Sequence, residues 1–188
     1  MRIIAGALKG RHLSSPDWPG LRPTSDRLRE TLFNILSDCV CGGTVLDACA
    51  GTGALGLEAL SRGAKRVVFV ERDQRASALI EEHVIRFRLT DCCDIVRGAI
   101  PAVTDDCMRG PFDVVLVDPP YDDPEIDAIL SSVGACLADH GVLVLERDRH
   151  SIAPRVAGLE VVRHVVSGGS TLDFFRRTAG ASSPEQGA

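Results

Sequence analysis

Long apolar runs are missing from this chain of 188 residues. The longest ones, at 114–117 and 141–145, are far shorter than the roughly 20 residues that a membrane-spanning helix needs. The residues after Met1 reach Lys9 and Arg11 without forming the apolar segment of a secretion signal. We therefore expect a cytoplasmic protein that makes no contact with a membrane.

The cysteines lack the spacing of a disulfide framework or of a metal site. They form Cys-x-Cys and Cys-Cys pairs but no Cys-x-x-Cys pair, and no cluster of cysteine and histidine accompanies them. Their number is odd, with residues at positions 39, 41, 49, 92, 93, 107 and 136. We expect reduced thiols, mostly buried as small hydrophobic side chains, and no metal ion.

Negative charge predominates, but it is unevenly distributed. The net charge of the whole chain is −5, whereas residues 1–30 carry six basic and three acidic side chains, which leaves −8 for the remainder. A basic segment on an acidic protein predicts a local contact with a polyanion, and the alternative is a solvated charged surface. The contents of 45% hydrophobic and 25% charged residues indicate a folded domain rather than a disordered chain.

Short apolar segments alternate with helix-like segments from residue 43 onward. We expect strands at 44–48, 66–70, 95–96, 113–117 and 142–146, and helices at 54–61, 74–88, 100–108 and 125–137. Two further segments, 159–166 and 171–177, flank a Ser-Gly-Gly-Ser turn and predict an antiparallel hairpin at one edge of the sheet. The pattern predicts an α/β fold, with a mostly parallel seven-stranded sheet, helices on both faces and an antiparallel C-terminal strand.

A short extension precedes this domain. Segments 2–5 and 11–14 flank a glycine-containing turn and predict a short β-hairpin, which a proline-rich loop follows. Thr24 or Ser25 then caps a helix that runs to about Leu36, with Leu28 and Leu32 on the face directed to the core. We therefore divide the chain into an extension at 1–23, a main domain at 24–177 and a disordered tail at 178–188.

The segment 45–56 has the pattern of a strand, a glycine turn and a helix start. Gly51 and Gly53 permit unusual backbone angles and a close approach of a ligand. Glu71, at the end of the next strand, is placed to accept hydrogen bonds from ribose hydroxyls. The spacing Gly-x-Gly-x-x-Gly also matches the dinucleotide site of a dehydrogenase. Asp47 favours S-adenosylmethionine, because its carboxylate repels a pyrophosphate but tolerates a cationic sulfonium amino acid.

The sequence Asp118-Pro119-Pro120-Tyr121 follows the apolar strand at 113–117. Ligands of parallel sheets bind at the carboxyl ends of strands, so this motif faces the same crevice as the glycine turn. A nucleobase amine is a poor nucleophile, and Asp118 and the Pro119 carbonyl can accept its N–H groups and orient it. The prolines fix the backbone, and Tyr121 offers a flat face for an extruded base. The motif predicts direct methyl transfer to an exocyclic amine, and the alternative is a turn that only ends the strand.

The two motifs together resemble the S-adenosylmethionine-dependent amino-methyltransferases, which have the Rossmann-like class I methyltransferase fold. More narrowly, residues 1 to about 177 resemble the ribosomal small-subunit methyltransferase D family. This narrower resemblance rests on 2–6, on 9–11, on the segment Leu-Arg-Pro-Thr-Ser-Asp-Arg-Leu-Arg-Glu-Thr-Leu-Phe-Asn at 21–34, and on 53–60. It implies methylation of N2 of guanine 966 in 16S rRNA of the small (30S) ribosomal subunit. We expect a monomer with no obligate protein partner.

The resemblance also implies roles for individual residues. It assigns cofactor binding to Asp47, Ala48, Cys49, Ala50, Gly51, Gly53, Glu71 and Arg72. It assigns catalysis to Asp118, Pro119, Pro120 and Tyr121, and contact with substrate RNA to Arg2, Lys9, Arg11, His12 and Arg22. Many such enzymes carry an acidic residue near the cofactor adenine, after the third strand. None stands at 97–100, so we expect backbone atoms to make that contact.

Other functions remain open from the sequence. An adenine-N6 methyltransferase of DNA or RNA, or a protein glutamine methyltransferase, would use a similar amine motif. A DNA enzyme normally needs a separate target-recognition domain, for which 188 residues leave little room. A protein substrate would not explain the basic extension. A non-catalytic ribosome-assembly factor is disfavoured by the intact amine motif, and a dehydrogenase by the lack of a recognisable hydride-transfer acid or base.

Overall fold

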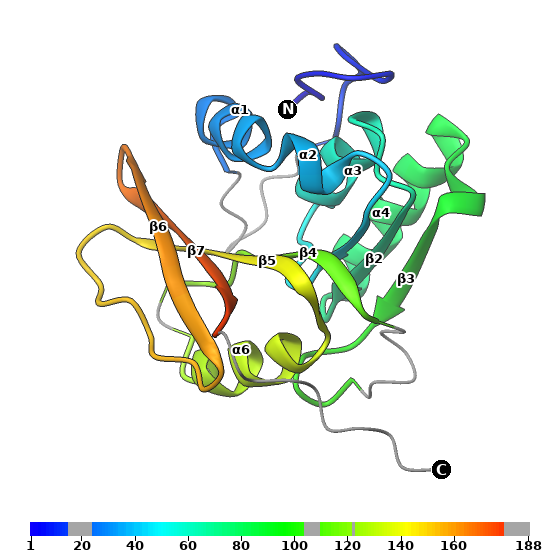
Figure 1. The fold of residues 1–188 in the computed structure, drawn as a ribbon. Coiled ribbons are helices and arrows are strands. Elements are labelled where there is room, and N and C mark those ends of the chain that lie inside the picture. Colours follow the sequence, from blue (N-terminus) through cyan, green and yellow to red (C-terminus); the bar gives the residue numbers. More distant parts are fainter. Residues whose placement is uncertain (15–23, 104–109, 122, 179–188) are drawn as a thin grey trace.

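The computed structural model describes residues 1–14, 24–103, 110–121 and 123–178. Its centre is a seven-stranded sheet with the order β3-β2-β1-β4-β5-β7-β6. Strands β1 to β5 are parallel, whereas β7 is antiparallel to both β5 and β6 (Figure 1). The predicted fold class is confirmed. The strands are β1 (Thr44–Asp47), β2 (Arg66–Glu71), β3 (Cys93–Arg97), β4 (Phe112–Val117), β5 (Leu137–Asp148), β6 (Leu159–Ser167) and β7 (Ser170–Arg177).

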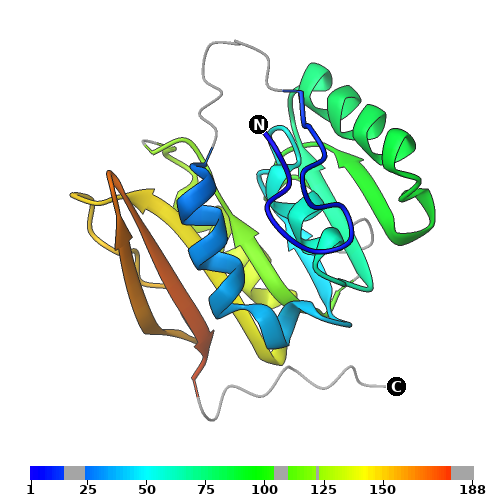
Figure 2. The same cartoon turned by 90° about the horizontal axis from the view of Figure 1, so that it is seen from above.

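Helices cover both faces of this sheet (Figures 1 and 2). One face packs against α1 (Asp26–Ile35), α2 (Ser37–Val40), α3 (Ala54–Ser61) and α4 (Gln74–Phe87), and the other against α6 (Ile126–Ala135). A short 3-10 helix, η1 (Thr90–Cys92), leads into β3. Because both faces are covered, neighbouring residues of one strand belong to opposite cores: Val45 to the first and Leu46 to the second. This explains why the central strands are continuous apolar runs.

Helix α1 begins where its capping residue predicts. The Ser25 hydroxyl accepts a hydrogen bond from the backbone N–H of Leu28 at 3.2 Å, and it satisfies one of the amides that a helix start leaves unpaired. Leu28, Leu32 and Phe33 are buried against the sheet. Burial of each such side chain contributes about 1.5–3 kcal/mol, which holds α1 across the sheet although it is short. No helix among the described residues is long and apolar enough to cross a membrane.

The predicted N-terminal hairpin is present, but it does not form two regular strands. Within residues 1–14 the structure has a single antiparallel bridge, between Arg2 and His12. The backbone amides of Ile4 and Ala5 donate instead to the two carboxylate oxygens of Glu58, at 2.7 and 3.0 Å. Glu58 lies on α3 and is fully buried. The hairpin is therefore shaped by its contact with α3, a partner that local sequence pattern cannot indicate.

The last turn of α3 provides a second anchor for the extension. The Ser61 hydroxyl accepts from the backbone N–H of Leu8 at 2.9 Å, and the Ser61 carbonyl accepts from Ala7 at 2.7 Å. The approach is so close that a Cβ placed on Gly6 would lie 1.8 Å from the Ser61 carbonyl oxygen. Only glycine is compatible with this contact, and the φ of Gly6, 81°, also favours glycine. Figure 2 shows the extension lying over α3.

One other expectation falls mainly outside the described residues, and another needs correction. Of the helix predicted at 100–108, residues 104–108 are not described, and in the described part Val103 donates its backbone N–H to the carbonyl of Ala99 at 3.0 Å within a turn. The prediction that the cysteines are mostly buried is wrong: five described ones are half-buried and Cys41 is exposed, while Cys107 lies outside the described residues. Cys39, Cys92 and Cys93 lie where helices end or strands begin, and a small side chain is only partly covered there.

The C-terminal hairpin forms the predicted antiparallel edge. An ionic cluster joins its strands to β5, because the buried carboxylate of Asp173 on β7 binds both Arg147 on β5 and the ring of His164 on β6. Beyond β7, Thr178 donates its backbone N–H to Gly158 at 3.0 Å. The rest of the predicted tail, 179–188, lies outside the described residues.

Candidate active site

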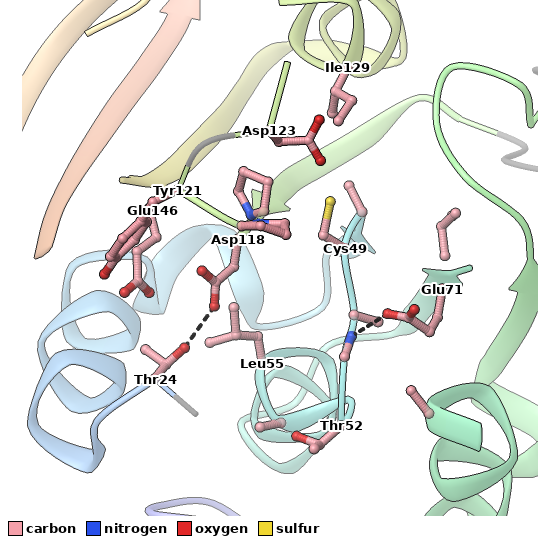
Figure 3. Close-up of a pocket in the computed structure, with 18 of the residues that line it drawn as sticks. Thr24, Cys49, Thr52, Leu55, Glu71, Asp118, Tyr121, Asp123, Ile129 and Glu146 are labelled. Carbon is pink, nitrogen blue, oxygen red and sulfur yellow. Dashed lines mark hydrogen bonds between the residues drawn. The ribbon is translucent and has the colours of Figure 1, made fainter. Parts of the chain in front are cut away.

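A cavity of about 800 Å³ lies at the carboxyl ends of β1, β2, β4 and β5. This is the end of the sheet at which its order reverses, between β1 and β4. The start of α1 and the turn at 167–170 complete its walls. Among the described residues, six acidic and three basic side chains line it: Glu71, Asp73, Asp118, Asp123, Glu125 and Glu146, with Arg27, Arg72 and Arg75. Figure 3 shows part of this lining.

The glycine turn is held to the end of β2 by one carboxylate. The Oε2 of Glu71 accepts from the backbone N–H of Gly51 at 2.7 Å, and Oε1 accepts from Asp73 at 2.7 Å (Figure 3). Gly51 has a φ of 53°, and Gly53, which precedes α3, has a φ of 76°. A side chain at either position would be strained, so the two glycines make the tight turn possible.

Asp47 takes a place that differs from the one expected. It does not line the cavity, and its side chain is buried beneath the glycine turn. Its Oδ2 accepts from the backbone N–H of Gly56 at 2.8 Å, which ties the end of β1 to the first turn of α3. Burial raises the pKa of Asp47 to about 7, against the hydrogen bond from Gly56, and the charge of Glu71 raises it further. Asp47 thus shapes the turn from below rather than facing the cavity.

The remaining predicted cofactor residues divide into two groups. Ala48, Cys49, Ala50, Gly51, Glu71 and Arg72 line the cavity, whereas Gly53 does not and serves the turn. Cys49 carries a thiol in the cavity, but burial raises its pKa to about 12, and the charges of Asp47 and Asp118 act in the same direction. The thiol therefore stays protonated and is a poor nucleophile, which agrees with a site that needs no covalent cysteine.

The wall after β3 contains no acidic side chain among its described residues. Gly98, Ala99 and Ile100 line this part of the cavity, and Gly98 donates its backbone N–H to the carbonyl of Glu71 at 3.0 Å. The surface is small, apolar and rich in backbone groups. Binding of a flat heteroaromatic ring here by main-chain atoms stays a prediction.

The four residues of the amine motif lie at the other end of the cavity. Asp118, Pro119, Pro120 and Tyr121 all line it. The Oδ2 of Asp118 accepts a hydrogen bond from the Thr24 hydroxyl at 2.8 Å (Figure 3). The Tyr121 hydroxyl lies 2.9 Å from the Ser170 hydroxyl. The start of α1 and the turn between β6 and β7 thereby hold the two polar side chains of the motif.

The sequence analysis did not identify three polar residues of the site as functional residues. The sequence pattern indicates Thr24 only as a helix cap and Ser170 only as part of a hairpin turn. Glu146 was counted as the end of an apolar strand, yet it lies beside Tyr121 in the cavity (Figure 3). Its position at the carboxyl end of the strand that neighbours β4 was a usable signal, because such ends face the ligand site.

The predicted RNA-binding residues that the structure describes lie outside this cavity. Arg2, Lys9, Arg11 and His12 are all exposed on the extension, and Arg2 forms an ion pair with Asp26 at 3.5 Å. Arg22, together with Trp18, lies outside the described residues. The four described residues form a basic surface on the same face of the sheet as α3, and whether RNA touches it stays a prediction.

The sequence matches a known family and several curated proteins. A family model described as conserved hypothetical protein 95 matches residues 1–176. The chain is 34% identical over 183 residues to the ribosomal RNA small subunit methyltransferase D of Escherichia coli K12, and the match covers 95% of this chain and 91% of that protein. It is 40% identical over 126 residues to the protein of the same name from Haemophilus influenzae, with 64% of each chain covered.

Solved structures agree in fold over nearly the whole chain. The Escherichia coli protein YhhF superposes with a TM-score of 0.80 at 30% sequence identity, and the match covers 95% of this chain and 98% of that one. A hypothetical protein from Thermus thermophilus gives a TM-score of 0.79 at 29% identity, with 94% and 99% covered. The extension and the hairpin edge are therefore included in the shared architecture.

Proposed function

The chain belongs to the ribosomal RNA small subunit methyltransferase D family, and we propose on this basis that it methylates N2 of guanine 966 in 16S rRNA. S-adenosylmethionine is the cofactor, and the substrate is RNA of the 30S ribosomal subunit. The enzyme acts as a monomer in the cytoplasm. One observation carries the proposal: a single cavity joins the glycine turn and Glu71 at one end to Asp118-Pro119-Pro120-Tyr121 at the other.

The first end of the cavity fits S-adenosylmethionine. A Cβ added to Gly51 would meet no atom within 4 Å beyond its chain neighbours, so the backbone of the turn is open to a ligand. Glu71 is fixed by two backbone amides and still faces the cavity, where its carboxylate can accept hydrogen bonds from ribose hydroxyls. Ala99 and Ile100 offer apolar surface to the adenine. When bound, the cofactor supplies an electrophilic methyl group on a sulfonium.

The second end of the cavity orients the amine. The hydrogen bond from Thr24 fixes the carboxylate of Asp118, which accepts one N–H of the exocyclic amine. The carbonyl of Pro119 accepts the other N–H. Both bonds would draw the nitrogen away from the planar geometry in which its lone pair is delocalised. The lone pair would then be free for a direct displacement in which the N–CH3 bond forms, the S–CH3 bond breaks to leave a neutral thioether, and the surplus N–H proton leaves by way of the Asp118 carboxylate. Most of the rate then comes from positioning.

The extension supplies RNA affinity in this proposal. Residues 1–23 contact RNA, and 24–177 form the catalytic domain. The exposed Arg2, Lys9, Arg11 and His12 can neutralise phosphates, which gives affinity without sequence specificity. The extension that carries them is docked on α3 through Glu58 and Ser61.

The proposal is tested by transfer of a radiolabelled methyl group to four substrates in parallel. These are unmethylated small subunits, bare 16S rRNA, DNA and bulk protein. We expect label in rRNA alone, at N2 of one guanine, and its loss in Asp118→Ala. Label at adenine N6, in DNA or in protein would refute the substrate assignment. No label despite measured cofactor binding would favour an assembly factor over an enzyme.

A further inference from the structure

Glu146 occupies a position next to the catalytic motif that the proposed mechanism does not use. It lies near the carboxyl end of β5, and the parallel register pairs Val117 with Leu145, so Asp118 and Glu146 are neighbours across the two strands. Both line the cavity, and only 7% of Glu146 is exposed. Figure 3 shows the carboxylates of Glu146 and Asp118 on the same side of the cavity, next to the ring of Tyr121.

The surroundings of Glu146 do not favour a carboxylate for packing alone. Leu32, Leu55 and Leu172 border the same small space as Asp118 and Glu146. A carboxylate in such a place depends on hydrogen bonds, and each of its oxygens can accept more than one. Because Glu146 lines the ligand cavity, it can accept a donor of the ligand beside any partner that it has in the protein.

Guanine brings such a donor at the position next to the reacting amine. Its Watson–Crick edge carries N1–H directly beside the N2 amine, whereas adenine has an unprotonated N1 acceptor beside its N6 amine. We infer that Glu146 accepts the N1–H of the target guanine while Asp118 and Pro119 hold N2. Adjacent carboxylates on adjacent strands thereby match adjacent donors on one edge of a base. The inference rests on the proposed function and makes Glu146 the residue that selects guanine.

Selection follows from the mismatch that any other base creates. An unprotonated N1 would place a lone pair against the carboxylate of Glu146, so both groups would lose their hydrogen bonds to water without gaining a partner. Hydrogen bonds to charged groups contribute about 1.5–3 kcal/mol. Loss of one such bond corresponds to a decrease of about 10- to 150-fold in kcat/KM for the mismatched base relative to guanine. Sites that hydrogen-bond a substrate N–H reject analogues that lack it more strongly than apolar pockets reject a missing methylene.

The test uses 2-aminopurine, which keeps the C2 amine of guanine but has no hydrogen on N1. Small subunits are reconstituted with either base at the methylated position, and kcat/KM is measured for both. The natural sequence, Glu146→Gln and Asp123→Asn are compared. Asp123 is the matched control, because it is another carboxylate of the cavity but lies near Ile129, away from Tyr121 (Figure 3). Glutamine can donate to an unprotonated N1, which aspartate or glutamate cannot do.

We expect the natural sequence to prefer guanine over 2-aminopurine by at least about 10-fold, and Glu146→Gln to reduce that preference about 10-fold, whereas Asp123→Asn leaves it unchanged. The two bases also differ at O6, which only guanine carries. This difference is the same for every variant, so it cancels when the preferences of the variants are compared. Equal losses on both bases in Glu146→Gln, with unchanged cofactor affinity, would show a structural role and overturn the inference. If Glu146→Gln does not fold, the unsubstituted enzyme still provides a test. Equal values of kcat/KM for guanine and 2-aminopurine in that enzyme would overturn the inference while leaving the proposed function intact. No transfer to any guanine would instead refute the proposed function, and the inference with it.

Discussion

Replacing Glu58 with glutamine removes the anchor of the N-terminal extension while leaving the volume of the side chain unchanged. Glu58 is fully buried, and its two oxygens accept from Ile4, Ala5 and the Nε of Arg62, the last at 2.8 Å. Glutamine offers one acceptor oxygen and one N–H₂ group. One of the two backbone amides then faces another donor, and Arg62 loses its ion pair.

The magnitude follows from these lost interactions. A backbone amide left without a partner costs about 1–3 kcal/mol, and weakening a hydrogen bond between charged groups adds to this, so we expect a loss of about 2–4 kcal/mol in the free energy of unfolding. In a domain of this size each kcal/mol lowers Tm by about 2–4 °C, so the expected decrease is about 5–15 °C. Urea and thermal unfolding measure both quantities.

The same substitution separates stability from RNA binding. If Arg2, Lys9 and Arg11 bind phosphates, release of their carrier from α3 lowers the affinity for 16S rRNA at fixed salt, while S-adenosylmethionine affinity changes little. Glu81→Gln is the matched control, since it makes the same chemical change at an exposed position of α4. A loss below about 0.5 kcal/mol, the usual range of surface substitutions, would refute the anchoring role. Destabilisation with unchanged rRNA affinity would refute the role of the extension in binding.

Three other predictions concern the cavity and its support. Asp118→Asn replaces an acceptor oxygen by a donor, so we expect methyl transfer to decrease by at least about 100-fold with cofactor affinity retained, as radiolabel transfer and calorimetry would measure. Gly56→Ala places a Cβ 2.2 Å from Cε1 of Phe69, so urea unfolding is expected to show a loss of about 1–3 kcal/mol or more, and an unchanged midpoint would contradict the described packing. The pKa of Asp47 is raised from 3.8 to about 7 in the folded protein, so its contribution to stability is fully present below pH 3.8 and is lost as pH rises through about 7. Its size is at most about 4 kcal/mol. The free energy of unfolding of the unsubstituted protein is therefore expected to fall between about pH 4 and pH 7, and this fall is expected to be smaller in Asp47→Asn.

Much of the fold was predictable because it depends on local sequence pattern. The bounds of α3 were predicted without error, since Gly53 and the apolar residues after it mark the helix start. The amine motif was located because strands of a parallel sheet expose their carboxyl ends to ligands. The docking of the extension was not predictable, since it depends on contacts between Ile4 and Glu58, which lie 54 residues apart in sequence.

The direction in which a side chain points was the other limit. Asp47 was expected to face the ligand, yet it turns under the loop because Gly56 offers a backbone donor there. Glu146 is the opposite case: the sequence pattern indicates only a strand residue, yet its side chain reaches the cavity. In both cases the backbone position was predictable, and the partner that decides the orientation lies on a different element.

The excess of acidic side chains around the cavity has a consequence for cofactor binding. S-adenosylmethionine carries a positive sulfonium, whereas the thioether left after methyl transfer is neutral at sulfur. Carboxylates such as Glu71 and Asp118 attract the first more strongly than the second, and low-dielectric walls increase the difference. The acidic side chains of the described lining therefore favour the charged cofactor over its neutral product electrostatically.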